Sequence, residues 1–157
     1  MQTFLPLESF EETARVLDGR RLNNQVNECM VILRTCLGLS DGWANHPAVK
    51  MWRGYESALA HYTVYIVEEC YKRWQNDKVY GKRLCNLDDI MDGYTHTWIL
   101  GIGCKMPPWL GNKNFHRSHR QALLAKNTEW YRQFWPEEEA KIEYVWPVEE
   151  TDNAHTD

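Results

Sequence analysis

The sequence predicts an all-α fold: one compact helical domain with irregular loops, followed by an extended acidic tail. Apolar residues recur at spacings of three and four in several segments, as on the buried face of a helix. Strict alternation of apolar and polar residues, the mark of a strand, never persists for more than a few positions. The chain has 157 residues, 43% of them hydrophobic and 25% charged, which suits one folded domain and excludes a disordered or collagen-like chain. We expect the domain to cover residues 1–148 and the flexible tail residues 149–157.

The first half of the chain contains three predicted helices. Ser9 is a suitable N-cap for the first helix, which the glycine at position 19 interrupts. A second amphipathic helix extends from about residue 22 to 37 and ends at Gly38. A third, long helix is expected to begin at Pro47, because proline suits the first turn, and to continue beyond Ile66.

The second half begins with a predicted loop over residues 76–83 and one or two short helices within 84–100. Residues 105–111 contain two prolines and a glycine and cannot form a regular helix. A further helix is predicted for 113–126, and a short aromatic one for 128–135.

Charge is unevenly distributed along the chain. The formal net charge is −4, but residues 136–157 contain eight acidic residues and one lysine, so that residues 1–135 carry +3. A mildly basic body is compatible with a nucleic-acid partner, and equally with a plain solvated tail on a near-neutral domain.

Five cysteines without a CxxC pair, and histidines without an HExxH pattern, give no support for a disulfide framework, a metal site or a cofactor. No run of about 18 apolar residues and no signal peptide is visible, so we expect a cytoplasmic protein that does not cross a membrane.

The segment 18–28 is the first candidate site. On a helix Arg21, Asn24, Gln25 and Glu28 share one face, with Arg20 beside them. A carboxylate rimmed by amides and arginines is typical of a catalytic group beside a phosphate-binding surface. An exposed helix face without function has the same pattern.

The segment 113–132 is the second candidate, with five basic residues against one acidic residue. It contains His116, Arg117, His119 and Arg120, and aromatic residues follow it. A DNA-binding surface needs basic side chains that bind phosphates and aromatic rings that stack on unstacked nucleobases. Some of these aromatic rings, however, must pack in the core. His46, just before the predicted helix at Pro47, is a third candidate, and is equally suited to capping or packing.

The N-terminal amine is the fourth candidate. In general an α-amine has a pKa near ~7.7–8.0, so an appreciable fraction is neutral at physiological pH and can attack a sugar carbon.

Several segments together resemble the pyrimidine dimer DNA glycosylases of the endonuclease V type. The matching residues are 1–6, 17–22, 25–28, 46–47, 51–52, 54–56, 107–111, 115–120 and 144–148. The resemblance implies an all-α fold and a glycosylase with abasic-site lyase activity. In that family the amine of an N-terminal threonine, exposed by methionine removal, attacks the sugar C1′, and an early glutamate stabilises the resulting imine. The glutamate corresponds to Glu28. Because Gln2 is too large for ordinary methionine removal, the free amine here would be that of Met1.

We therefore expect a DNA glycosylase and abasic-site lyase acting on pyrimidine dimers or modified pyrimidines, without a cofactor. The expected catalytic residues are Met1 and Glu28, and the expected DNA-contacting residues are Arg20, Arg21, Asn24, Gln25, His46, His116, Arg117, His119 and Arg120. The alternatives are a non-catalytic nucleic-acid-binding module on the same scaffold, and an interaction protein whose acidic tail competes with DNA for its basic face.

Overall fold

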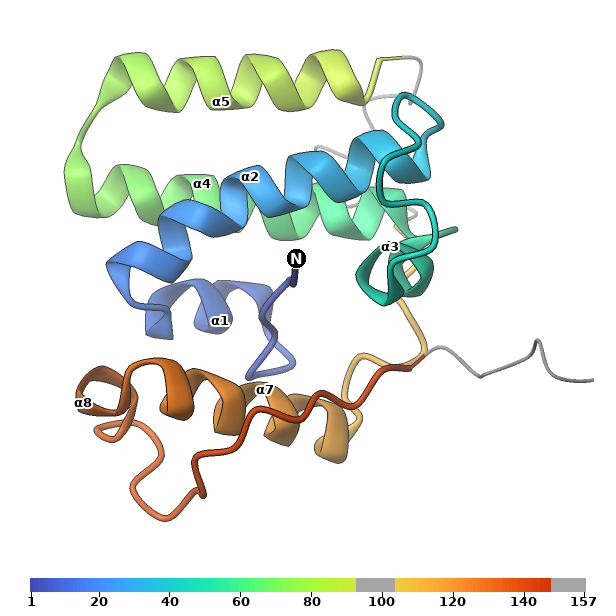
Figure 1. Ribbon diagram of the computed structural model, residues 1–157. Helices are drawn as coiled ribbons and strands as arrows, with labels where there is room; N and C mark the ends of the chain where they lie inside the picture. Colours follow the sequence, from blue (N-terminus) through green and yellow to red (C-terminus); the bar gives the residue numbers. More distant parts are fainter. Residues whose placement is uncertain (93–103, 148–157) are drawn as a thin grey trace, which may run out of the picture.

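The computed structural model describes residues 1–92 and 104–147, and within these ranges the chain forms seven helices and no strand (Figure 1). The all-α prediction is therefore confirmed for this part of the chain. The helices are α1 (Phe10–Val16), α2 (Gly19–Cys36), α3 (Pro47–Trp52), α4 (Glu56–Trp74), α5 (Asp77–Ile90), α7 (Lys113–Lys126) and α8 (Thr128–Tyr131). None of them is both long and apolar enough to cross a membrane.

Polar side chains cap the helices that shape the site. Ser9 Oγ accepts a hydrogen bond from the backbone N–H of Glu12 at the start of α1. Asp18 caps α2 by accepting from the backbone N–H of Arg21 at 2.9 Å. Each cap satisfies an N–H group that has no partner within its own helix, which fixes where the helix begins.

The helices form a layered bundle in which α2 packs against α4, and α4 also contacts α1 and α5. Figure 1 shows α5 at one side of the α2–α4 pair and α7 and α8 at the other, beyond α1. The core contains large side chains that are fully buried, among them Trp52, Tyr62, Phe115 and Tyr131. Much of the aromatic content of the sequence is thus core packing.

The N-terminal segment, residues 2–6, is extended and buried between α2 and α7 (Figure 1). An extended segment inside a helical bundle has no neighbouring strand to pair its backbone N–H and C=O groups, and leaving them unpaired would be costly. Side chains from α2, α4 and α7 therefore have to supply these hydrogen bonds, and they determine the geometry of the site described below.

The single long helix predicted from Pro47 is wrong, because the structure has two helices there. α3 ends at Trp52, and α4 begins at Glu56. Gly54 between them has a φ of 84°, a left-handed conformation that no α-helix contains. The Glu56 carboxylate accepts a hydrogen bond from the Gly54 N–H at 2.8 Å, which stabilises the break.

The loop predicted for residues 76–83 is also wrong, because α5 covers them. Asn76 caps this helix by accepting from the backbone N–H of Val79, and Gln75, with a φ of 50°, ends α4 just before it. Residues 84–90, expected in short separate helices, continue α5. The helix predicted for 113–126 is confirmed as α7, whereas the short aromatic helix ends at Tyr131 and not at residue 135. The rest of the predicted 84–100 region, from 93 on, and the predicted acidic tail lie outside the described residues.

Candidate active site

A pocket of about 360 Å³ opens where the N-terminal segment meets the first turns of α2. Its walls come from the N-terminal segment, α2, the end of α7 and the segment 141–147. The lining residues are Met1, Gln2, Phe4, Arg20, Arg21, Asn24, Gln25, Glu28, Lys126 and Tyr144. The structure thus brings both predicted catalytic residues and four of the predicted DNA contacts to one pocket.

The pocket lining is cationic. Arg20, Arg21 and Lys126 line it against the single carboxylate of Glu28, and Met1, which bears the N-terminal amine, is a lining residue as well. Arg20 and Lys126 are exposed. Arg21 is half-buried, and its Nη1 lies 3.3 Å from Asp18 Oδ2, an ion pair that orients the guanidinium at the start of α2. This charge distribution favours an anionic ligand such as a DNA backbone.

Gln25 on α2 holds the N-terminal segment through both ends of its carboxamide. Its Oε1 accepts from the Phe4 N–H at 2.9 Å, and its Nε2 donates to the Gln2 carbonyl at 2.9 Å. The Tyr62 hydroxyl, on α4, donates to the Phe4 carbonyl beside it. Gln25 is 1% exposed. Its polar atoms are therefore already used within the protein, which gives Gln25, a predicted DNA contact, the role of holding the N-terminal segment.

His116 and His119 on α7 hold the same segment from the other side. The Nδ1 of His116 lies 2.7 Å from the Leu5 carbonyl oxygen, and the Nδ1 of His119 accepts from the Leu5 N–H at 2.9 Å. Because His116 Nε2 accepts from the Gly111 N–H, its Nδ1 carries the hydrogen that it donates to Leu5. Burial lowers the pKa of His116, and it lowers the pKa of His119 to about 3, with the charge of His116 as a smaller contribution.

Both histidines are buried, at 5% and 0% exposure, so neither presents a nitrogen to a DNA phosphate. The structure thus places His116 and His119, both predicted as DNA contacts, as neutral, buried groups that hold the N-terminal segment.

Two further side chains complete the clamp. Trp52 Nε1 donates to Thr3 Oγ1 at 2.9 Å, and Arg120 Nη1 donates to the Pro6 carbonyl at 3.0 Å. Consecutive residues from 2 to 6 are thus held by hydrogen bonds from α2, α3, α4 and α7. The consequence is that Met1 directly precedes a held segment and lines the same pocket as Glu28.

His46 lies beside this pocket and not in its lining. Its Nδ1 caps α3 by accepting from the Ala48 N–H at 3.1 Å. Burial lowers its pKa, the positive charge of the N-terminus lowers it further, and the charge of Glu28 partly opposes both effects. Trp43 and Trp146 pack edge-on against its ring, with centroids 5.8 and 6.0 Å away.

Arg117 and Arg120 are engaged in ion pairs within the protein. Glu138 lies between them, 2.8 Å from Arg117 Nε and 3.3 Å from Arg120 Nε. Both arginines hold the pKa of Glu138 below its usual value although burial opposes this. The Arg117 side chain is 57% exposed and borders a second small cavity that shares Tyr144 with the pocket.

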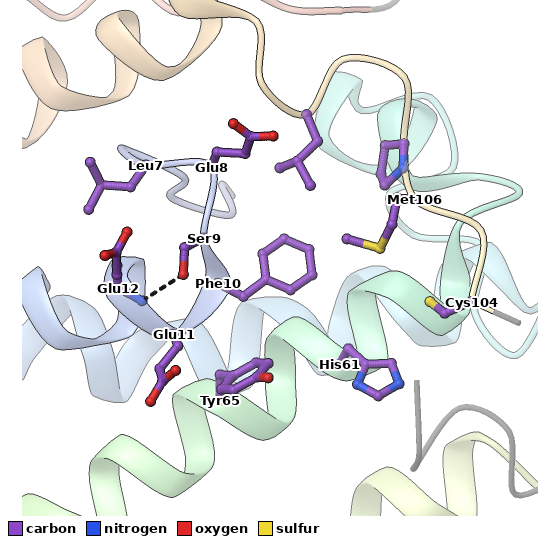
Figure 2. Close-up of a pocket in the computed structure, with 12 residues that line it drawn as sticks. Leu7, Glu8, Ser9, Phe10, Glu11, Glu12, His61, Tyr65, Cys104 and Met106 are labelled. Atoms are coloured by element: carbon purple, nitrogen blue, oxygen red, sulfur yellow. Dashed lines mark hydrogen bonds between the residues drawn. The ribbon is translucent and has the colours of Figure 1, made fainter. Parts of the chain in front are cut away.

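A larger pocket of about 840 Å³ has a different character (Figure 2). Phe10 and Met106 point toward each other inside it, and His61 and Tyr65 enter from α4. Three carboxylates and no lysine or arginine line it, so it suits a DNA phosphate poorly despite its size. Its lining residues are Leu7, Glu8, Ser9, Phe10, Glu11, Glu12, His61, Tyr65, Cys104, Met106, Pro107 and Leu110. The smaller pocket is therefore the candidate active site.

Four residues of the pocket lining were not among the predicted site residues: Gln2, Phe4, Lys126 and Tyr144. Lys126 ends the predicted basic helix, and Tyr144 belongs to the last matching segment of the resemblance, so both were visible without being assigned to the pocket. The sequence indicates only that Gln2 is too large for methionine removal, and nothing in it places the side chain in the pocket. Within residues 1–92 and 104–147, no group of three or more His, Cys, Asp and Glu is arranged to hold a metal ion.

The structure therefore describes an all-α protein with a cationic pocket built around its own N-terminus. A family model described as pyrimidine dimer DNA glycosylase matches residues 1–80, which include the N-terminal segment and all of helices α1 to α4. The chain belongs to the pyrimidine dimer DNA glycosylase family. Membership makes it a DNA glycosylase of DNA repair, with DNA as its substrate. No curated protein and no solved structure matches the chain.

Proposed function

We propose that this glycosylase also acts as an abasic-site lyase, and that it proceeds through an imine between the Met1 α-amine and the deoxyribose of a damaged pyrimidine nucleotide. The single observation that carries the proposal is the common pocket of Met1 and Glu28 in a member of this family. The clamp on residues 2–6 supports it, because a positioned nucleophile avoids the entropic cost of being ordered in the transition state.

In the first step the neutral amine attacks C1′ and a C1′–N bond forms. The glycosidic bond breaks, and the pyrimidine leaves with its bonding electrons and takes up a proton. Opening of the sugar ring then breaks the C1′–O4′ bond, O4′ gains a proton, and a protonated imine remains on the enzyme.

In the second step Glu28 acts on this cation. A carboxylate beside a protonated imine stabilises its charge, and the same carboxylate is suited to assist removal of a proton from C2′. Loss of that proton expels the 3′ phosphate, which breaks the strand. Water hydrolyses the imine and restores the free amine.

The cationic rim supplies the DNA contacts in this proposal. Arg20, Arg21 and Lys126 would bind phosphates on either side of the damaged nucleotide, and the exposed Asn24 lines the same pocket. Arg117 lies further along the surface, beyond Tyr144. His46, packed between Trp43 and Trp146 beside the pocket, would contact the DNA next to these two rings.

Borohydride trapping on abasic DNA tests the proposal. We expect the chain with an unmodified N-terminus to form a covalent adduct that mass spectrometry locates on Met1. An N-terminal tag or acetylation should abolish the adduct while DNA affinity stays nearly unchanged. Lys126 is the lysine of the pocket lining and provides the matched control. If Lys126→Ala abolishes trapping and the tag does not, the amine of Met1 is not the nucleophile. A wild-type chain that excises the base without any adduct would mean that the reaction does not pass through an imine, and one that binds DNA without excising a base would indicate the non-catalytic binding module.

A further inference from the structure

We propose that the carboxamide of Gln2 binds the hydrogen-bonding edge of the damaged pyrimidine and so determines which base is excised. This inference rests on the proposed function, because it places the substrate sugar at the Met1 amine. It adds a substrate-binding residue next to the nucleophile, distinct from the phosphate contacts at the rim.

The Gln2 side chain is the unsatisfied polar group of the pocket. Gln2 is 7% exposed and lines the pocket, yet neither its Nε2 nor its Oε1 has a hydrogen-bond partner among the described residues. Gln25, its neighbour in the same pocket, uses both ends of its carboxamide within the protein. A buried amide without a protein partner costs free energy until water or a ligand pairs with it, and a base bound in this pocket would be such a partner.

Hydrogen bonds fix the backbone around Gln2, whereas its buried carboxamide makes none with a described residue. The Gln2 carbonyl accepts from Gln25 Nε2 at 2.9 Å, and the next residue, Thr3, is held by Trp52. No hydrogen bond to a described residue restrains the carboxamide. Rotation of the side chain toward a ligand in the pocket therefore breaks no such bond and gains two.

The position of Gln2 suits contact with a base. It directly follows Met1, whose amine has to reach the C1′ atom that carries the base. Any nucleotide placed for that attack brings its base to the walls next to Met1, and Gln2 forms one of them. Its side chain is long enough to follow the base while the main chain stays clamped.

The chemistry of the two groups matches. A carboxamide offers one N–H donor side beside one carbonyl acceptor. The edge of a thymine or uracil presents a carbonyl beside the N3–H, so two parallel hydrogen bonds can form. A pyrimidine dimer is joined through C5 and C6, and its carbonyl and N3–H groups remain available. Purines placed with their sugar at the amine would present a larger ring system to the same wall.

Two substrates separate base recognition from catalysis. Gln2→Leu removes both polar atoms, keeps nearly the same volume and leaves a residue that is still too large for methionine removal. We expect Gln2→Leu to reduce base excision from dimer-containing DNA by tenfold or more. Cleavage and borohydride trapping of abasic DNA of the same sequence, which has no base to bind, should stay within about twofold of wild type. The melting temperature should be equal or higher, because an unpaired buried amide is removed.

The exposed Gln133, outside the pocket lining, provides the matched control. Gln133→Leu should leave both reactions unchanged. Gln2→Met, which is unbranched and of similar length, serves as a second variant if Gln2→Leu does not fold.

Two results would overturn the inference alone. Equal losses on both substrates would mean that Gln2 positions the amine and does not bind the base, and unchanged excision would mean that the carboxamide has no role. A failure of the proposed function looks different, because the wild-type chain would then leave no adduct on abasic DNA, and the inference would fall with it.

Discussion

His119 on α7 accepts a hydrogen bond from the backbone N–H of Leu5 at 2.9 Å, although the two residues lie 114 positions apart in the chain. The bond is inside the protein, since both residues have no exposed surface. It joins the C-terminal half of the domain to the segment that carries the proposed nucleophile. The imidazole can accept this bond only while Nδ1 is unprotonated, so the geometry of the N-terminal segment depends on a neutral histidine.

This dependence predicts a loss of stability in acid. The pKa of His119 is about 3 in the folded protein, against about 6.5 in an unfolded chain. Between these values the unfolded chain binds a proton that the folded protein excludes, so the free energy of unfolding falls as the pH falls from about 6.5 toward 3. The slope is at most about 1.4 kcal/mol per pH unit for His119, and His116, whose pKa is also lowered, adds to it.

Thermal unfolding between pH 7 and pH 4.5 measures this effect. His119→Asn keeps an acceptor oxygen near the position of Nδ1 but does not titrate, so its melting temperature should depend less steeply on pH. His155→Asn, the same replacement at a histidine outside the described residues, serves as the control. Equal pH slopes for wild type and His119→Asn would contradict the prediction.

Loss of Gln25 should harm both the fold and the reaction. Gln25→Leu leaves the Phe4 N–H and the Gln2 carbonyl without their partners inside the protein, and each such group costs about 1–3 kcal/mol. We expect a reduced melting temperature and, below the transition, weaker borohydride trapping, because the Met1 amine is less well positioned. Asn24→Leu, on the exposed side of the same helix turn, should leave stability nearly unchanged. Trapping at the wild-type rate by folded Gln25→Leu would mean that the clamp is dispensable for the reaction.

The basic residues should differ in how they contribute to DNA binding. Arg20 and Lys126 are exposed at the pocket, whereas Arg117 is already paired with Glu138. Replacing either pocket residue by alanine should weaken binding to all sequences alike and reduce the salt slope by about 1. Arg117→Gln should change the slope less, because Glu138 neutralises it in the free protein. Arg120 also holds the Pro6 carbonyl, so its replacement would mix a binding effect with a structural one.

Binding isotherms at several salt concentrations distinguish these residues. A slope that falls more for Arg117→Gln than for Arg20→Ala would show that DNA displaces Glu138 and uses the α7 surface as its main contact.

Local periodicity was enough to predict the α2 face of the site. Arg21, Asn24, Gln25 and Glu28 follow the spacing of one helix face, and all four line the pocket. The same reasoning located α7 correctly, because Asn112 caps it and its apolar positions recur regularly. These features depend on residues close together in the sequence.

The remaining features depend on partners far apart in the sequence. A histidine at position 116 or 119 of a basic helix has the same pattern whether it faces DNA or a buried backbone, and only the fold reveals Leu5 as its partner. The break at Gly54 was missed because a single glycine is tolerated in an amphipathic pattern, and only its positive φ shows that the helix ends. Gln25 was assigned to DNA because an amide on an arginine-rich face is typical of DNA contacts, whereas its neighbours Phe4 and Tyr62 come from other segments.

The most direct test of the proposed chemistry is Glu28→Gln. Glu28 is half-buried in the pocket, and no ion pair with a described residue engages its carboxylate. Glutamine has nearly the same shape, so the fold, the clamp on residues 2–6 and DNA affinity should be retained. A neutral amide cannot offset the charge of a protonated imine or accept the C2′ proton. Removing one such preorganised group costs about 2–4 kcal/mol of transition-state stabilisation, or about 30- to 1,000-fold in rate.

Single-turnover cleavage of abasic DNA measures this loss. The control for removing a carboxylate is Glu56→Gln, at the start of α4 and outside the pocket lining. Cleavage by Glu28→Gln at the wild-type rate would exclude Glu28 from the mechanism even if Met1 is the residue that borohydride traps.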